Sequence, residues 1–135
     1  TVLDPNQIEQ SVLNIVRNGI QALAKSLQDK TQTEFPPTLT IKTRFAGGKV
    51  IQDKQFRKVL KISIIDNGTG ISEDLIDTIF YPLVTDKADG NGLGLSIAQT
   101  LVDQHQGKIT VASVPGNTQF NIYLPVIEHE KGNSI

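Results

Sequence analysis

The sequence has no cysteine. This absence excludes a disulfide framework, thiol chemistry and any zinc site built from cysteine, and it fits a reducing, cytoplasmic location. The apolar runs are only a handful of residues long, whereas a membrane-spanning helix needs about 20. No signal-peptide pattern opens the chain. We therefore expect a cytoplasmic protein without a membrane segment.

An excess of either charge is also missing, since 14 acidic residues stand against 13 lysines and arginines. Charge therefore gives no argument for nucleic acid or for a membrane surface as a partner. The 135 residues suffice for one domain with a sizeable core. We assign residues 1–127 to that domain and expect a disordered polar tail at 128–135. A chain that starts at Thr1 instead of Met is expected to be a piece of a longer protein.

Helical and extended patterns alternate along the chain. Apolar residues at helical spacing, after an N-cap signal at Asp4 and Pro5, predict a helix over 5–28. Strand alternation begins near 38, and Ala46-Gly47-Gly48 predicts a turn with a return strand after it. The other predicted elements are a strand over 58–66, a short helix over 73–80, a helix over 93–106 ended by Gly107, and a hairpin over 108–125.

These elements amount to about three helices and five strands. An α/β (α+β) two-layer sandwich buries their apolar faces best, with a mixed sheet of about five strands and three helices on one of its faces. No internal repeat or low-complexity tract suggests another architecture.

Two glycine-rich loops stand out, DNGTGI at 66–71 and DGNGLGL at 89–95. The second is no dinucleotide fingerprint, because Leu95 stands where a glycine is needed and no apolar strand precedes the loop. GGKV at 47–50 lacks the Ser/Thr and the spacing of a P-loop. DNGTGI fails as a calcium loop because Gly68 and Gly70 replace oxygen ligands. A single loop of this kind is most simply an ordinary turn.

Three observations together weaken that simple interpretation. Asp66 ends an apolar strand, where a carboxylate is costly unless it meets a hydrogen-bond donor. The glycines of the second loop precede a helix, whose free N–H groups and positive dipole end form an anion site. Asn14 and Asn18 lie four residues apart, hence on one face of the first helix, within an otherwise apolar stretch.

These features fit one ligand, a nucleoside triphosphate. A carboxylate in an apolar pocket accepts a hydrogen bond from an exocyclic amine such as that of adenine. A glycine-rich helix start holds phosphates, and an asparagine oxygen suits the Mg²⁺ that bridges them. We therefore expect the base at the first loop and the phosphates at the second.

With these residues in place, the chain resembles the catalytic, ATP-binding domain of two-component sensor histidine kinases, which belongs to the Bergerat-type ATPase/kinase superfamily. The motifs that carry the resemblance are NIVRNGIQAL (14–23) as the N box, DNGTGI as the first G box, IFYPLVTDK (79–87) as the F box, GNGLGL (90–95) as the second G box, and GNTQFNIYLP (116–125) as the closing strands. Order and spacing match over residues 4–125. RNGIQAL, PLVTDK and IAQTLVDQHQGKI are most similar to nitrogen-regulation sensor kinases of the NtrB type.

The resemblance implies roles for particular residues. Asn18 would bind Mg²⁺, Asn14 would approach the phosphates or the metal, and Asp66 would read the adenine amine. Residues 81–92 would form a mobile lid. Arg17 and Lys87 join the two asparagines as candidate catalytic residues that contact phosphate, although solvated charges fit both positions too. The implied ATP-binding residues are Asn14, Asn18, Asp66, Gly68, Gly70, Ile71, Thr85, Lys87, Gly90, Asn91, Gly92, Leu93, Gly94, Leu95, Lys108 and Thr118.

Some positions carry a simpler explanation or depart from the family pattern. Lys108 follows a helix C-terminus, where a cation is favoured anyway, and Thr118 also fits a plain strand residue. Gly19 stands where the family usually has alanine, and Asn91 where it usually has threonine. These two departures bear on helix stability and on lid flexibility.

The identity of residue 14 separates two kinds of chemistry within the superfamily. Its hydrolases and its protein serine kinases carry glutamate four residues before the metal-binding asparagine, as general base. Asn14 occupies that position here, and an amide accepts no proton at neutral pH. Glu9 and Gln10 lie two turns or more from Asn18, roughly 12 Å along the helix, too far to substitute. A neutral imidazole needs no base, so Asn14 favours histidine phosphorylation over hydrolysis.

The resemblance therefore implies the ATP- and Mg²⁺-dependent catalytic domain of a protein histidine kinase in nitrogen regulation. The γ-phosphate would go to a histidine on a separate phosphoacceptor domain of the same, dimeric protein. Further partners would be a response regulator and a P-II-type nitrogen signal protein. His105 and His129 are not expected to be acceptors, because no H-E-x-x-x-P-like box surrounds them. A nucleotide-dependent clamp ATPase and a non-catalytic nucleotide sensor remain as alternatives.

Overall fold

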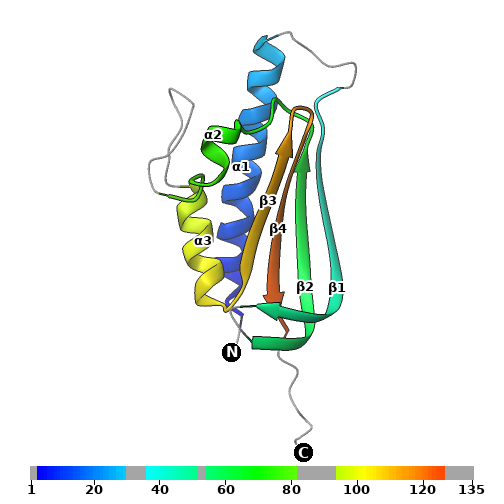
Figure 1. The fold of residues 1–135 in the computed structure, drawn as a ribbon, viewed down its shortest axis with the longest axis vertical. Coiled ribbons are helices and arrows are strands. Elements are labelled where there is room, and N and C mark those ends of the chain that lie inside the picture. The colour runs from blue at the N-terminus through cyan, green and yellow to red at the C-terminus, as the bar shows by residue number, and fades with distance from the viewer. Residues whose placement is uncertain (1–2, 30–35, 52–53, 82–93, 127–135) are drawn as a thin grey trace, which may run out of the picture.

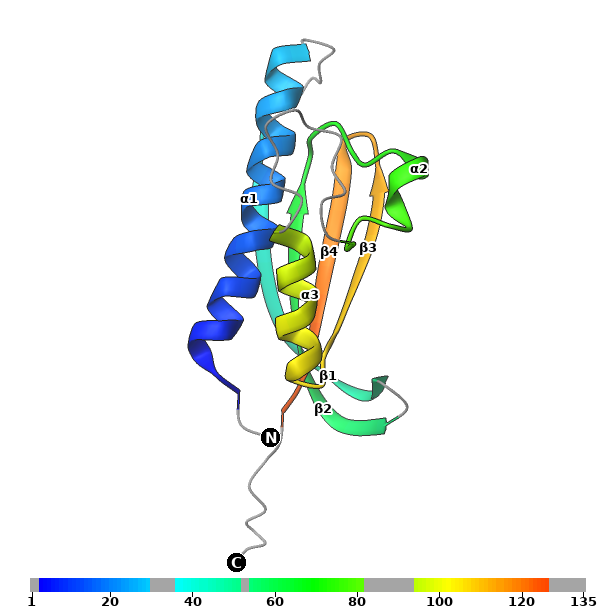
Figure 2. The same cartoon turned by 90° about the vertical axis from the view of Figure 1, so that its left-hand side faces the viewer.

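A computed structural model describes residues 3–29, 36–51, 54–81 and 94–126, which form two layers (Figure 1 and Figure 2). The elements are α1 (Pro5–Asp29), β1 (Leu39–Ile51), β2 (Lys54–Asp66), α2 (Glu73–Ile76), α3 (Gly94–Gln104), β3 (Lys108–Val114) and β4 (Asn117–Pro125). All the helices lie on one face of the sheet, with α1 beside α3 (Figure 2). The expected α+β sandwich is therefore confirmed.

The first helix forms where its sequence signals predict it. The Asp4 carboxylate accepts hydrogen bonds from the backbone N–H groups of Asn6 and Gln7, at 3.0 and 3.3 Å. These bonds satisfy donors that the first turn leaves without partners, and Pro5 follows at the position where its missing N–H costs nothing. From this start α1 presents Ile15, which is fully buried, to the core.

The sheet differs in two details from the expected one. Within the described residues it has four strands in the order β1-β2-β4-β3 instead of about five, and every neighbouring pair is antiparallel, so the sheet is not mixed. The predicted turn at residues 46–48 is wrong, because β1 continues through Gly47, which pairs with Lys58 of β2. Pairing with β2 outweighs the local preference of two glycines for a turn, so the expected return strand merges with β1.

The core lies between the sheet and the helix layer. Its buried members from the helices, the segment after α2 and the strands are Ile15, Ile62, Ile64, Ile79, Leu95, Ala98, Val102, Ile109, Phe120, Ile122 and Leu124. Phe80 meets Phe120 edge to face, with ring centroids 6.1 Å apart. The predicted helix over 73–80 is shorter than expected, because only α2 is helical and turns follow it up to Phe80. These turns hold Ile79 and Phe80 against the sheet.

The end of α3 corrects the assignment of Gly107 as the helix-ending glycine. Gln106 has the left-handed conformation, with φ of 62°, and its N–H and that of Gly107 donate to the carbonyls of Asp103 and Val102. This is the Schellman arrangement, with Gln106 in the place where glycine is usual. Gly107 is needed for another reason, since a Cβ there would lie 2.5 Å from the Tyr123 carbonyl oxygen.

Some expectations concern parts of the chain that the structure does not describe. The expected tail at 128–135 and all but the first residue of the expected lid at 81–92 lie outside the described residues. None of the helices within the described part is both long and apolar enough to cross a bilayer.

The contact at Gly107 generates a stability prediction. We expect Gly107→Ala to destabilise the fold by about 1–3 kcal/mol, because the new methyl group meets a backbone oxygen that cannot rotate away. Gly94→Ala is the matched control, since a Cβ at Gly94 has no neighbour within 4 Å among the described residues and alanine favours a helix. Thermal unfolding of both variants checks this, and equal melting temperatures would contradict it.

Candidate functional site

Asp66 lies at the end of β2, enclosed by two neighbouring strands. Its Cα partners are Leu39 in β1 and Thr118 in β4, and only 2% of the residue is exposed. One carboxylate oxygen accepts a hydrogen bond from the Gly68 N–H at 2.9 Å. The predicted buried carboxylate is therefore present, and a backbone donor offsets part of the cost of burying it.

The loop that follows Asp66 is tied to the β3–β4 hairpin. The Gly68 carbonyl accepts a hydrogen bond from the Gly116 N–H at 2.9 Å, and the Ile71 N–H donates to the Ser113 hydroxyl at 2.9 Å. Ser113 is in turn 2.6 Å from the hydroxyl of Thr118, which is 2% exposed. Thr118 thus supports the loop that contains the two predicted glycines, in addition to pairing with Asp66.

Two of the glycines at this site allow close approach of α1. The backbone of Gly68 lies so near α1 that a Cβ would sit 2.9 Å from the Ala22 carbonyl oxygen. On α1 itself, a Cβ at Gly19 would lie 2.8 Å from the Leu39 side chain and 3.5 Å from the Asp66 carboxylate. Because Gly19 and Gly68 have no side chain, the helix, the loop and the Asp66 carboxylate can lie in contact. Gly70 has a different role, since its φ of 90° requires glycine.

Asn14 and Asn18 occupy the flank of α1 turned away from β1. Gly19 faces Leu39 of β1, and helical spacing puts the asparagines on the other side of the buried Ile15. Asn14 is 6% exposed, yet its amide nitrogen has no hydrogen-bond partner among the described residues. A buried donor without a partner costs about 1–3 kcal/mol, so a partner outside the described residues would stabilise this amide.

The second glycine loop is described only at its end. Gly94 begins α3, and Leu95 is buried in the core. Ile71 is partly buried against the same core. The remaining predicted positions of this loop and of the lid, which are Thr85, Lys87, Gly90, Asn91, Gly92 and Leu93, lie outside the described residues.

Two predicted cations are not brought to Asp66. Lys108 pairs with Tyr123, whereas Asp66 pairs with Thr118. Five residues of β4 separate these two pairs, about 17 Å along the strand, so Lys108 lies at the far end of the sheet. Arg17 is exposed on α1. For these two residues a solvated charge is the simpler interpretation.

Asn67 has a role that the sequence analysis missed. Its side-chain oxygen accepts a hydrogen bond from the Thr38 N–H at 2.8 Å, and its amide donates to the Pro36 carbonyl at 2.9 Å. Asn67 therefore ties the loop to the segment that enters β1. An asparagine followed by glycine is too common in turns to signal such a partner about 30 residues away.

His105 has a structural role instead of an acceptor role. The residue is 4% exposed, one ring nitrogen is 2.8 Å from the Leu101 carbonyl and the other accepts a hydrogen bond from the Asp4 N–H at 3.0 Å. Since the Asp4 N–H occupies the Nε2 lone pair, the proton lies on Nδ1 and is donated to Leu101. No lone pair is left for a phosphoryl group.

Sequence comparison identifies the family to which the chain belongs. Residues 3–128 match the family model described as histidine kinase-, DNA gyrase B-, and HSP90-like ATPase. The chain belongs to this ATPase family. The resemblance drawn from the five motifs is thereby confirmed.

Individual relatives narrow the likeness within the ATPase family. The chain is 49% identical over 122 residues to the sensory histidine kinase/phosphatase NtrB of Proteus hauseri, covering 90% of this chain and 32% of the relative. It is 46% identical to NtrB of Klebsiella oxytoca, covering 91% and 33%. The chain thus spans about a third of the length of the curated relatives it matches.

Solved structures give the same fold. The nucleotide-free catalytic domain of the histidine kinase ThkA superposes with a TM-score of 0.67 at 27% identity, covering 91% of this chain and 68% of that one. The mycobacterial sensor histidine kinase MprB, at 22% identity and a TM-score of 0.63, covers 93% and 76% and supports the fold alone.

The two glycines that contact α1 and the loop generate paired predictions. We expect Gly68→Ala to destabilise the ATPase domain by about 1–3 kcal/mol and to weaken ATP binding, because its methyl group would meet the rigid backbone of α1. We expect Gly19→Ala to be tolerated, since the contacted Leu39 methyl group can rotate and alanine adds up to about 1 kcal/mol of helix propensity. Thermal unfolding and ATP titration measure both, and a Gly68→Ala variant as stable as Gly19→Ala would refute the distinction.

Proposed function

We propose that this ATPase domain is the catalytic part of a sensor histidine kinase that acts in nitrogen regulation. It binds ATP with Mg²⁺ and positions the γ-phosphate for transfer to a histidine on a separate domain. The likeness to the sensory histidine kinase/phosphatase NtrB over nine-tenths of the chain supports this proposal. The whole protein is about three times as long as this chain if it resembles those relatives, so its activity and partners are inferred from them.

The observation that carries the proposal is the buried amide of Asn14, whose nitrogen has no hydrogen-bond partner in the part of the chain that the structure describes. The amide is a donor that can stabilise an anionic ligand, and it cannot accept a proton from water. A hydrolase needs a general base at this end of the site, whereas a neutral imidazole attacks phosphorus with its own lone pair. Phosphoryl transfer then depends mainly on positioning and charge neutralisation, which buried donors and a rigid helix supply.

Asp66 is the residue that we assign to recognition of the adenine base of ATP. Its burial at 2% exposure keeps water from competing for the carboxylate, and the Gly68 N–H fixes its orientation. An acceptor held in this way selects the amino group at C6 of adenine over the carbonyl oxygen at C6 of guanine. Gly70, Ile71 and Thr118 are assigned to the same end of the site, because the hairpin holds them there.

The donor set fits a magnesium ion that arrives with the nucleotide. Among the described residues no group of three or more histidines or carboxylates gathers into a metal site. Asn18, half-buried one turn from the unpaired Asn14 amide, offers a single hard oxygen ligand of the kind that Mg²⁺ accepts beside phosphates and water. The ion would supply neutralisation of phosphate charge.

The partners follow from the same proposal. The acceptor would be a histidine domain of the same, dimeric protein, since both nitrogens of His105 are engaged. A response regulator would receive the phosphoryl group, and a P-II-type nitrogen signal protein would regulate the kinase. The cytoplasmic location likewise stays a prediction. A clamp ATPase would hydrolyse ATP without transferring its phosphate to a histidine. A non-catalytic sensor would bind ATP without transfer.

The direct test of the function is phosphoryl transfer. This chain, mixed with labelled ATP, Mg²⁺ and the phosphoacceptor domain of a related NtrB, should label that domain in an acid-labile form without labelling itself. Binding of ATP without transfer would indicate the sensor, and rapid phosphate release without transfer would indicate the clamp ATPase.

Asp66→Asn tests the assignment of the base. We expect the variant to fold, because an amide oxygen can still accept the Gly68 N–H, but to bind ATP more weakly by about 1–3 kcal/mol, since a donor now faces the adenine amine. Titration with ATP and GTP, each in parent and variant, measures the selectivity. A variant that still discriminates ATP from GTP as the parent does would remove Asp66 from this role.

Asn14→Glu tests the choice between transfer and hydrolysis. The new carboxylate should weaken ATP binding by charge repulsion, yet raise hydrolysis at saturating ATP, since general base catalysis is typically worth about 10²–10⁴-fold when well placed. Phosphate release is followed with Asn14→Glu/Asn18→Ala as the blank. If ATP binding is retained and hydrolysis is no faster than in the parent, Asn14 does not set the reaction.

A further inference from the structure

The long strand β1 forms one edge of the sheet. β1 spans 13 residues, and within the described part of the chain only β2 pairs with it. One row of its backbone N–H and C=O groups therefore has no partner strand. Such an edge is a template for another extended chain unless side chains block it.

The helix-side face of β1 exposes apolar side chains along this edge. Ile41 and Phe45 are paired with Ile64 and Leu60, which belong to or contact the core. Yet Ile41 is 51% exposed and Phe45 is 61% exposed, although the Lys58 ammonium lies 4.8 Å from the Phe45 ring centroid. The helix layer thus covers β2 and leaves the margin of β1 open.

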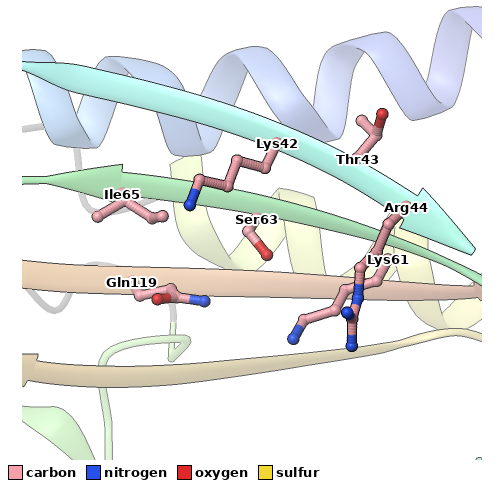
Figure 3. A pocket seen from close by; sticks show the side chains of 7 residues that line it. All are labelled: Lys42, Thr43, Arg44, Lys61, Ser63, Ile65 and Gln119. Carbon is pink, nitrogen blue, oxygen red and sulfur yellow. The ribbon is translucent and has the colours of Figure 1, made fainter. Parts of the chain in front are cut away.

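The opposite face of β1 carries cations that have no acidic neighbour on the strands that the structure describes. A shallow hollow of about 590 Å³ lies there, lined by Lys42, Thr43, Arg44, Lys61, Ser63, Ile65 and Gln119. Figure 3 shows Lys42 and Arg44 on the same side of the sheet as Lys61, whereas Thr43 points away. The described strands contain a single carboxylate, that of Asp66, and it is buried at the end of β2.

The arrangement of these charges favours an anionic partner. Arg44 stands directly opposite Lys61, and like charges facing each other across strands repel. The polar side chains beside these cations do not relieve the repulsion. The Asn121 side-chain oxygen already accepts hydrogen bonds from Ser63 at 2.7 Å and Gln119 at 2.9 Å. A carboxylate between the cations would relieve it.

We propose that the free edge of β1 binds an extended polypeptide segment in which acidic and apolar residues alternate. Residues i and i+2 of a strand lie about 6.8 Å apart on one face, so two acidic side chains of such a segment match Lys42 and Arg44. The residue between them then lies beside Thr43, and the residues that flank the acidic pair lie beside Ile41 and Phe45. Backbone hydrogen bonds supply affinity and the alternating side chains supply specificity.

The apolar side of the edge decides among anionic partners. A nucleic acid or an anionic membrane would satisfy the cations alone and would leave Ile41 and Phe45 exposed. Cations that merely guard the edge against aggregation would not be accompanied by exposed apolar side chains on the same strand. An alternating polypeptide uses both faces and the edge between them.

A peptide of alternating glutamate and valine, labelled with fluorescein, tests the proposal on this chain. We expect Lys42→Glu/Arg44→Glu to weaken its binding by about tenfold or more and to create binding of the matching lysine–valine peptide. The same glutamate–valine peptide methylated on its backbone nitrogens should bind the parent at least about tenfold more weakly, because it cannot pair with an edge. Lys108→Glu, a charge reversal on the other edge strand, should leave peptide binding unchanged.

The outcomes that overturn the proposal are equally defined. They are equal binding of the methylated peptide, equal binding by the double variant, or tighter binding of the parent to oligothymidylate or phosphatidylserine vesicles. Thermal unfolding verifies that the variants fold. If the double variant does not, Lys42→Gln/Arg44→Gln replaces it, and amide exchange in the parent must still slow within β1 when the glutamate–valine peptide is present.

Discussion

The burial of one carboxylate is the constraint on which the site depends. Asp66 can be enclosed between Leu39 and Thr118 because the Gly68 N–H returns to bond it. That return requires a loop folded tightly against α1, which only a residue without a side chain permits at position 68. The hairpin between β3 and β4 then fixes the loop from its other side. Helix, loop and hairpin therefore take their places around a single buried carboxylate.

The sequence predicted those features that depend on neighbouring residues or on residue types that are costly to bury. The start of α1 followed from Asp4 and Pro5, whose capping role involves neighbours only. Asp66 and Asn14 were found because polar groups within apolar segments need a reason, and both are buried. Most of the second glycine loop lies outside the described residues, so its predicted part in the site stays a prediction.

Predictions failed where a distant partner decides the local conformation. The glycines after Ala46 favour a turn by themselves, but pairing of Gly47 with Lys58 keeps β1 extended. Gly107 was assigned to the helix end, whereas the carbonyl of Tyr123 is what excludes a side chain there. Lys108 follows the helix closely in sequence, yet the register of β3 with β4 sends it away from Asp66. Each of these partners lies too far along the sequence to be inferred from the residues next to the feature.

The bond between the Asp4 N–H and His105 has a consequence for the order of folding. Both hairpins of the sheet close short stretches of chain, whereas this bond joins residues 101 apart. Loop-closure entropy grows with the length of chain enclosed, so contacts of such separation form after local ones have shortened the path. The start of α1 and the end of α3 should therefore join last, as a clasp that closes the helix layer over a sheet already in place. The same clasp would be the first to open when the domain begins to unfold from its N-terminus.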